Sequence, residues 1–283
     1  MYSLILENEW KQQVELTHNE DNWQVTNVDG LNSPPAVISS STVAGFDGAK
    51  FSSSRLDVRN IVITFVINGN VEKNTIYLNS IVMPKRAIRV YYRNHSKGLY
   101  VNGYVESFEY NKFSQKVEAQ ISIICPQPYW MDEEASETVL SYVISLFEFP
   151  IAIPKEGIAL SEIADSPSAS VINYGNVECG LQIEIEASQN IILPTINNLT
   201  SHQHITLNVE MQPGDRILIN TIKGQKSIRK DCNCEETNVI DKLEAGSSWI
   251  NLLPGENRFS YNASYGKQNM KITIKHRNLY GGV

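Results

Sequence analysis

The feature that most constrains the fold is a set of short segments in which apolar and polar residues alternate. In Leu181–Ala187, Leu, Ile and Ala alternate with Gln and Glu, and Val117–Ile123 has a similar pattern. Successive side chains of a strand point to opposite faces, so each segment predicts a strand with one buried and one solvated face. Composition agrees, because β-branched Ile (31) and Val (21) outnumber Leu (19) and Ala (13).

Further short segments of this kind are separated by Gly, Asn, Pro and Ser clusters, which favour turns. They predict strands at Arg59–Ile67, Ile88–Tyr92, Tyr100–Tyr110, His204–Glu210, Arg216–Ile222, Arg258–Ala263 and Lys271–His276. One short helix is predicted at Thr75–Met83, because Pro84 disfavours helical geometry in the residue before it. The regular spacing predicts a mainly β fold with two antiparallel β-sandwich domains.

The length of 283 residues and two composition shifts predict two domains. The first covers residues 1–130 and ends where the two prolines of CPQPYW stop the strand pattern. Residues 131–169 are predicted to form a linker and an extended connector, which begins with the acidic MDEEASE and continues through a proline-containing stretch. The second sandwich is predicted over residues 170–283.

The net charge disfavours a nucleic-acid-binding protein, because 24 basic and 31 acidic residues give a net charge of −7. Residues 1–130 hold 12 basic and 12 acidic side chains, so the whole deficit lies in the remainder. The sequence shows neither a secretory signal pattern nor a window approaching 18 consecutive apolar residues, so neither export nor a membrane span is expected. The four cysteines are therefore expected to be reduced thiols.

Signatures of catalysis and metal binding are weak. The sequence lacks G-x-S-x-G, H-E-x-x-H, a P-loop and G-x-G-x-x-G. His202-x-His204 and Cys232-x-Cys234 leave a zinc site open, but surface histidines and a cysteine-containing turn are the favoured interpretation of this spacing. The chain is predicted not to be an enzyme and to bind no cofactor or metal.

Ser33–Arg55 is long, rich in Gly and Ser and poor in charge, so it cannot fill a core by itself. Its Asp47-Gly48 dipeptide is favoured in tight β-turns and predicts a hairpin. Two interpretations are open. The hairpin is either a loose surface element or an arm that adds strands to another subunit, whose partner groups satisfy its unpaired edges.

The order of several motifs resembles that of a known family. Asn27–Ile67 contains NVDGL, a Pro, AGFDGAKF and SRLDVRNIVITFVI, and the second half contains FEFPIAIPKEG, VINYGNVECGLQIEI, PTIN, GDRILINTIKGQKSI, LLPGEN and a closing NLYGGV. Together these motifs resemble distal tail proteins (Dit), the tail-tip and baseplate hub family of long-tailed bacteriophages. Each motif alone is unspecific, but their shared order spans most of the chain.

The resemblance implies a structural virion protein of the tail tip, assembled in the bacterial cytoplasm as a homo-hexameric ring. The ring joins the tail tube protein to the tail-associated lysin or tail spike and to the host-adhesion device, with the receptor-binding protein as a further candidate partner. The first domain builds the ring through a protruding β-hairpin, the belt, at Pro35–Arg55, and the second domain is galectin-like. Candidate residues at the subunit contacts are Val43, Phe46, Asp47, Gly48, Phe51, Arg55 and Arg59.

The resemblance also implies that DNA passes through the ring without specific binding, which needs a neutral or acidic wall. The residues whose placement decides this are Glu72, Glu106, Glu109 and Glu118.

Two other function classes are open. The main alternative is a lectin-like, glycan-binding sandwich with an adhesion role, and a hydrolase with an unrecognised site is less supported. Sugar rings could stack on aromatic side chains predicted near loops, which are Tyr129, Trp130, Trp249, Tyr261 and Tyr265. For Tyr129 and Trp130, packing at the domain junction is the favoured interpretation.

Overall fold

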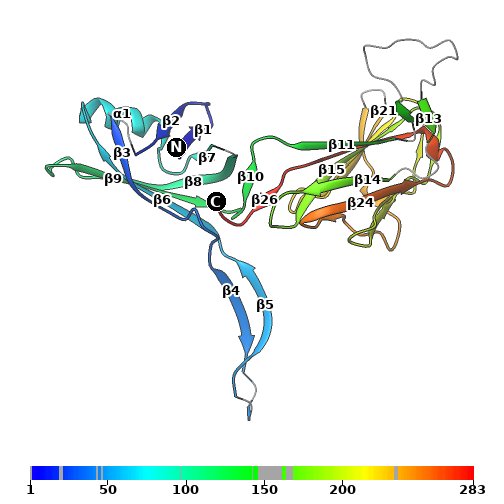
Figure 1. The fold of residues 1–283 in the computed structure, drawn as a ribbon, viewed down its shortest axis with the longest axis horizontal. Helices are drawn as coiled ribbons and strands as arrows, with labels where there is room; N and C mark the ends of the chain where they lie inside the picture. The colour runs from blue at the N-terminus through cyan, green and yellow to red at the C-terminus, as the bar shows by residue number, and fades with distance from the viewer. Residues whose placement is uncertain are drawn as a thin grey trace. The chain divides into compact units, whose positions relative to one another are not determined.

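The computed structural model describes residues 2–18, 22–42, 44–45, 47–95, 97–141, 143–145, 161–163, 168–232 and 235–283. The chain forms two compact units (Figure 1). Unit 1 consists of Met1–Glu133 together with Leu279–Val283, and unit 2 consists of Glu134–Asn278. Within the described ranges, no helix has the length and apolar character that crossing a membrane requires.

Unit 1 is built on a nine-stranded antiparallel sheet whose main path runs β2-β1-β7-β8-β9-β6-β3. Its strands are β1 (Ser3–Asn8), β2 (Gln13–Leu16), β3 (Trp23–Asp29), β6 (Arg59–Ile67), β7 (Ala87–Arg93), β8 (Gly98–Tyr110), β9 (Val117–Cys125), β10 (Trp130–Asp132) and β26 (Leu279–Tyr280). The alternation seen in the sequence places one face of each strand in the core. In β6, for example, Ile61, Ile63 and Phe65 are fully buried.

The one α-helix among the described residues, α1 (Val71–Ile81), packs Leu78 and Ile81 into this core. It begins four residues before the predicted start at Thr75. The reason is a cap: the Asn70 side chain accepts a hydrogen bond from the Lys73 backbone N–H at 3.1 Å, which satisfies a free donor of the first turn.

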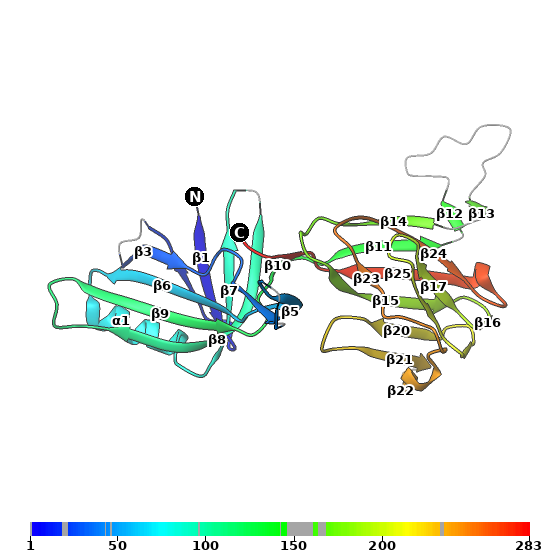
Figure 2. The same cartoon turned by 90° about the horizontal axis from the view of Figure 1, so that it is seen from below.

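Unit 2 is a two-sheet sandwich in which β11, β25, β15, β20, β21 and β22 lie side by side, with β23 pairing β15 (Figure 2). The bounds of this sheet are β11 (Ser136–Ser141), β15 (Cys179–Ala187), β20 (Arg216–Asn220), β21 (Ser227–Cys232), β22 (Glu235–Asn238), β23 (Asn251–Leu252) and β25 (Met270–His276). The second sheet has the order β14-β24-β17-β18, with β14 (Ser168–Asn173), β17 (Thr195–Asn198), β18 (Gln203–Thr206) and β24 (Gly255–Asn262). Short elements complete the unit: β12 (Val143–Ser145), β13 (Ser161–Ile163), β16 (Ile191–Ile192), β19 (Glu210–Met211), η1 (Ile240–Lys242) and η2 (Lys267–Asn269).

The mainly β, antiparallel fold with one short helix and a protruding hairpin is confirmed. Two details of the segment boundaries differ from the sequence prediction. Ser136–Ser141, inside the predicted connector, is strand β11 of unit 2, and Leu279–Tyr280, inside the predicted second domain, is a strand of unit 1. Residues 146–160 of the predicted connector lie outside the described residues.

Candidate assembly site

The belt is a two-stranded hairpin separate from the nine-stranded sheet of unit 1 (Figure 1). Its strands are β4 (Ala36–Ser41) and β5 (Lys50–Leu56), so the name belt is used below for residues 36–56. Every residue of both strands is exposed except Leu56, which is half-buried. A hairpin with both faces and both outer edges in water is only marginally stable. The belt is therefore structurally incomplete in the single chain.

A β-bulge gives the belt two different faces. The register shifts between Ser39 and Ser40, where β5 carries an extra residue, and Phe51 pairs with Ser40. Paired residues share a face and side chains alternate along a strand, so Phe51 lies on the same face as Ile38. Their side chains are 61% and 65% exposed. Without the extra residue, Phe51 would share the face of Arg55.

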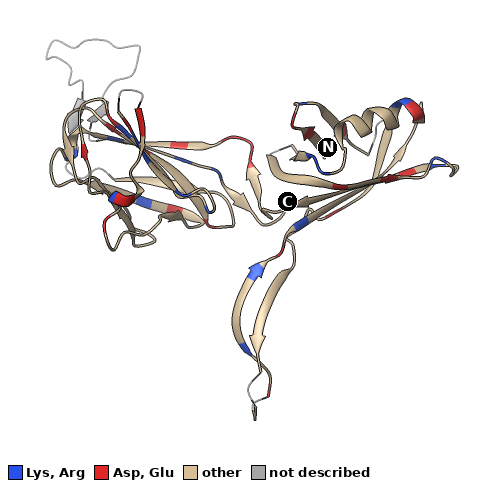
Figure 3. Cartoon of the chain, turned by 180° about the vertical axis from the view of Figure 1, so that it is seen from behind, with Lys and Arg blue, Asp and Glu red and all other residues tan. Residues whose placement is uncertain are grey.

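The opposite face carries both cations of the belt. Lys50 pairs with Ser41 and Arg55 pairs with Val37, so the alternation along the strands puts both basic side chains on the face away from Phe51. The basic positions of the belt are blue on the ribbon in Figure 3. The belt holds these two basic residues and one acidic residue, a net charge of +1, whereas the whole chain carries −7.

Four of the predicted contact residues are exposed on the belt. Asp47, Gly48, Phe51 and Arg55 are all open to solvent, and Gly48 has φ +90°, the left-handed backbone that a tight turn needs. Val43 and Phe46 lie outside the described residues.

Arg59 requires a correction. Its side chain is 0% exposed and donates hydrogen bonds to backbone carbonyls of its own unit. It is therefore not available to a neighbouring subunit. The sequence prediction failed here because arginine is rarely fully buried.

A second surface is the solvent-facing side of β3, β6, β9 and β8. Residues paired across these strands form rows on one face; one row joins Glu109, Gln120, Thr64 and Asn27. Another row places Glu118 beside Val66. The opposite face of the same strands forms the core of unit 1.

This solvent-facing side, called the acidic face below, carries carboxylates and amides, and none of the described strand residues on it is Lys or Arg. Glu109, Glu118 and Asp29 lie on it, and Glu106 reaches it by accepting a hydrogen bond from the Ser122 hydroxyl at 2.7 Å. Arg59, the one Lys or Arg in the sequences of the four strands, is buried on the other side. Glu72 is elsewhere: it lies on α1 and pairs with Lys112 at 2.9 Å. Three of the four glutamates singled out in the sequence therefore share one surface.

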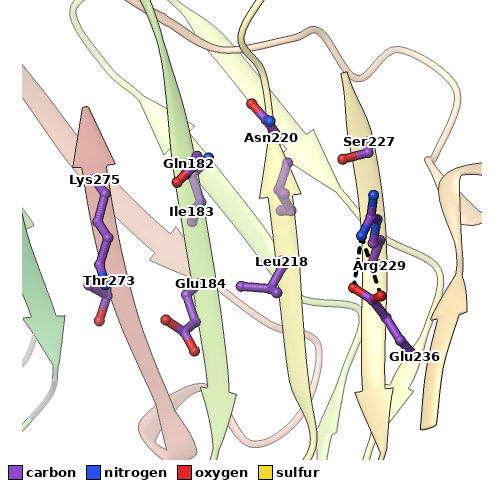
Figure 4. A pocket seen from close by; sticks show the side chains of 11 residues that line it. Gln182, Ile183, Glu184, Leu218, Asn220, Ser227, Arg229, Glu236, Thr273 and Lys275 are labelled. Atoms are coloured by element: carbon purple, nitrogen blue, oxygen red, sulfur yellow. Dashed lines mark hydrogen bonds and ion pairs between the residues drawn. The ribbon is translucent and has the colours of Figure 1, made fainter. Parts of the chain in front are cut away.

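Unit 2 carries a shallow groove of about 280 Å³ on its larger sheet (Figure 4). Amide, hydroxyl and charged side chains line it together with Leu218, and the Arg229 guanidinium lies 3.2 Å from the Glu236 carboxylate. None of the lining residues described there is aromatic, so the groove offers no ring on which a sugar could stack. The glycan-binding alternative stays a prediction without support from this groove.

The aromatic and metal-ligating candidates do not gather into a site. Trp130 and Tyr261 are buried, in agreement with the packing interpretation for Trp130, and Tyr265 is exposed. Among the described residues, no group of three His, Cys, Asp or Glu side chains could hold a metal ion. Cys234, one of the sequence candidates, lies outside those residues.

The sheet under the groove is held by a buried carboxylate. Asp215 accepts hydrogen bonds from the Lys230 ammonium, the Gln212 backbone N–H and the Cys232 thiol, each at 2.8 Å. Burial by itself raises the pKa of Asp215, but these three hydrogen bonds outweigh burial, and the net effect lowers the pKa below its usual range. The ionised form is therefore the one that stabilises the fold.

We expect Asp215→Asn to lower the free energy of unfolding at pH 7 by about 1–3 kcal/mol, because the half-buried Lys230 ammonium loses its charge-assisted bond to a carboxylate. The stability that the ionised carboxylate adds is present above its unfolded pKa of about 3.9 and is lost as pH falls through the lower folded pKa. The difference between wild type and variant should therefore shrink in acid. Thermal unfolding at pH 7 and pH 3 measures it, with Glu236→Gln as the control for an exposed pair. An equal difference at both pH values would contradict the assignment.

The chain is similar to known proteins both in sequence and in fold. Residues 174–280 match the family model described as the siphovirus-type tail component, C-terminal domain. No curated protein sequence matches the chain. Among solved structures, the Dit protein (gp 19.1) of phage SPP1 is similar over 98% of this chain and 99% of that chain, with a TM-score of 0.70 and 14% identity. A chain of the phage P2 baseplate in its activated conformation with Ca is similar over 98% of both chains, with a TM-score of 0.50 and 11% identity.

The predicted resemblance is thus confirmed on two independent grounds, sequence and fold. The family match covers the larger part of unit 2, and the structural match covers 98% of the chain. The chain has the fold of a phage distal tail protein, and its residues 174–280 are similar to the C-terminal domain of siphovirus-type tail components.

Proposed function

We propose that this chain is a non-enzymatic hub of a long-tailed phage tail tip, in which six copies form a ring. The SPP1 protein that it resembles is described as a paradigm of the hub adsorption apparatus of phages that infect Gram-positive bacteria. The observation that carries the proposal for this chain is the belt, a fully exposed hairpin with unpaired edges and one apolar face. The tail tube protein, the lysin or spike and the receptor-binding protein are the partners that such a hub would join.

The belt is compatible with a ring when it binds a different surface of the next copy, because that contact is head-to-tail. A reciprocal two-fold pair would also seat both belts, so the ring rests on the hub proposal and the particle mass distinguishes the two assemblies. A head-to-tail contact closes into a ring when its rotation is an integral fraction of a turn. The apolar face with Ile38 and Phe51 is the face that we place against the next copy, because burying it removes exposed apolar surface from water.

The acidic face is suited to a channel for DNA. A wall with carboxylates and without exposed Lys or Arg cannot release counterions from a phosphate backbone, so it does not hold DNA as the DNA passes. We infer that Glu106, Glu109 and Glu118 face the lumen of the ring.

The purified chain should therefore assemble into annular particles of about 190 kDa, six times the chain mass of 31.8 kDa. Replacing residues 36–56 by a short Gly-Ser linker should leave monomers with an unchanged melting temperature, because the belt adds almost nothing to the core. Mass photometry and negative-stain electron microscopy measure the outcome. Rings that persist without the belt, or a belt-containing chain that stays monomeric at high concentration, would refute the proposal.

A further inference from the structure

Arg59 is the first residue of β6 and is separated from the end of the belt by Asp57 and Val58. Its fully buried guanidinium donates hydrogen bonds to five backbone carbonyls. They are those of Pro128 at 2.7 Å, Gly30, Leu31 at 3.1 Å, Asn32 at 2.6 Å and Gly281 at 2.6 Å. We call these five groups the carbonyl cage.

The cage holds a charge without a counter-ion. None of the ion pairs found among the described residues includes Arg59, and its pKa is lowered by burial. A guanidinium nevertheless stays protonated in proteins, and charge-assisted bonds to carbonyls offset the loss of hydration. The Trp130 ring lies 5.4 Å from the guanidinium carbon, and its indole N–H donates to the Leu31 carbonyl at 3.2 Å. All three guanidinium nitrogens donate to main-chain carbonyls, so the role of this group is to fix segments in place.

The segments that the cage joins are the two ends of the belt. Residues 30–32 lead into β4, and Arg59 follows β5, so the cage closes the base of the hairpin from both sides. Just above it, the Asp57 backbone N–H donates to the Pro35 carbonyl at 3.1 Å. Gly30 is required by this close approach: it has φ +85°, and a Cβ there would lie 1.9 Å from the Asn60 carbonyl oxygen.

The remaining acceptor comes from the far end of the sequence. Gly281 follows β26, and its neighbour Val283 donates its backbone N–H to the Leu31 carbonyl at 3.2 Å. The chain therefore returns from unit 2 to complete the carbonyl cage at the base of the belt.

We propose that Arg59 is a positioning residue that fixes the root of the belt, and that the last residues of the chain act as a latch which completes its cage. The inference deepens the proposed function and rests on it for the consequence in assembly. A belt whose root is fixed pays less conformational entropy when it binds the next copy. Fixing of the belt root by Arg59 is a property of the single chain and does not depend on assembly.

The test is residue-resolved amide hydrogen exchange on the monomeric fraction of three variants. Arg59→Lys keeps a charge but loses the fork of donors, and a chain ending at Tyr280 keeps Arg59 and strand β26 but loses the Gly281 acceptor. In each, exchange at the Asp57 amide should accelerate by about tenfold, the equivalent of one lost charge-assisted bond. Val283→Ala keeps the Gly281 acceptor and the backbone N–H of residue 283, so this variant should exchange like wild type.

Two further measurements separate positioning from general stability. The Ile63 and Phe65 amides lie between β3 and β9 and should keep their exchange rates, whereas a merely stabilising arginine would accelerate them together with Asp57. In the chain ending at Tyr280, Arg59→Lys should add little further acceleration, because both changes open the same cage. Uniform acceleration, or an unchanged Asp57 rate in the chain ending at Tyr280, would overturn the proposal.

Mass photometry measures separately how the variants affect ring formation. Ring formation by Arg59→Lys should require at least about tenfold more protein than wild type, in line with the exchange effect. If the wild-type chain forms no ring, the proposed function fails while the exchange rates still decide the role of Arg59.

Discussion

Exchanging two neighbouring residues of the belt, as Lys50→Phe with Phe51→Lys, should abolish ring formation while leaving the monomer folded. The exchange keeps length, composition and net charge. It moves the aromatic ring from the face of Ile38 to the face of Arg55 and puts an ammonium group in its place. Losing the burial of one phenyl ring costs about 2 kcal/mol at each contact, and the ammonium must in addition be desolvated. The first cost alone raises the dissociation constant of each contact by about 30-fold.

The other strand of the belt supplies a matched control. Val37→Ile with Ile38→Val also exchanges two neighbours, but each face keeps an aliphatic side chain of similar size. This variant should assemble like wild type within a fewfold change in concentration. Sedimentation velocity over a concentration series compares the three chains, and their melting temperatures should coincide because all four positions are exposed. Normal assembly of the Lys50/Phe51 exchange would mean that the apolar face is not the contact face.

The strands of the sheets were predictable because alternation is a local property. β6 begins and ends at the predicted residues, Arg59 and Ile67. The start of α1 was missed because the polar Asn70 lies outside the apolar pattern, although its side chain is what begins the helix. A search for capping residues upstream of the pattern would have found it.

The sequence did not predict which side chains share a face of the candidate surfaces. A β-bulge inserts an extra residue and so shifts the alternation of side chains between the two faces of a strand. Glu106 and Glu109 are three residues apart and would lie on opposite faces of a regular strand. A register shift between Val105 and Ser107 brings both to the acidic face. The same effect separates Phe51 from Arg55 in the belt. The sequence singled out these residues in both cases but could not establish which of them share a face.

The role of Arg59 was hidden for a different reason. Its acceptors are backbone carbonyls, which carry no side-chain signal, and Gly281 is far from it in sequence. The available signal was the glycine of NVDGL together with the closing NLYGGV, since glycines often mark a close approach of main chains. Those motifs contributed to the family resemblance, yet their physical purpose became visible only in the carbonyl cage.

Reversing charge on the acidic face, as Glu106→Lys, Glu109→Lys and Glu118→Lys together, should convert the proposed channel from a passive wall into a DNA-binding one. Each copy gains three cations on a surface that had no exposed Lys or Arg, and a ring multiplies them around one axis. Every phosphate neutralised releases counterions, so affinity should fall steeply with salt, by about a thousandfold or more between 50 and 200 mM for six or more contacts. DNA ejection from assembled particles should slow at low salt and recover at high salt.

The control is an equal charge change in unit 2, Glu235→Lys, Asp241→Lys and Glu244→Lys, at exposed positions outside the acidic face. If the position of the added charges determines the effect, this control keeps the wild-type ejection rate although its net charge is identical to that of the acidic-face variant. Equal slowing in both variants would show that total charge, rather than the acidic face, governs passage. Failure of the first variant to form rings would instead place Glu106, Glu109 and Glu118 at a subunit contact, because cations exposed in an open lumen do not disturb the packing between copies. The two variants therefore distinguish a lumen wall from an interface by whether assembly or ejection responds.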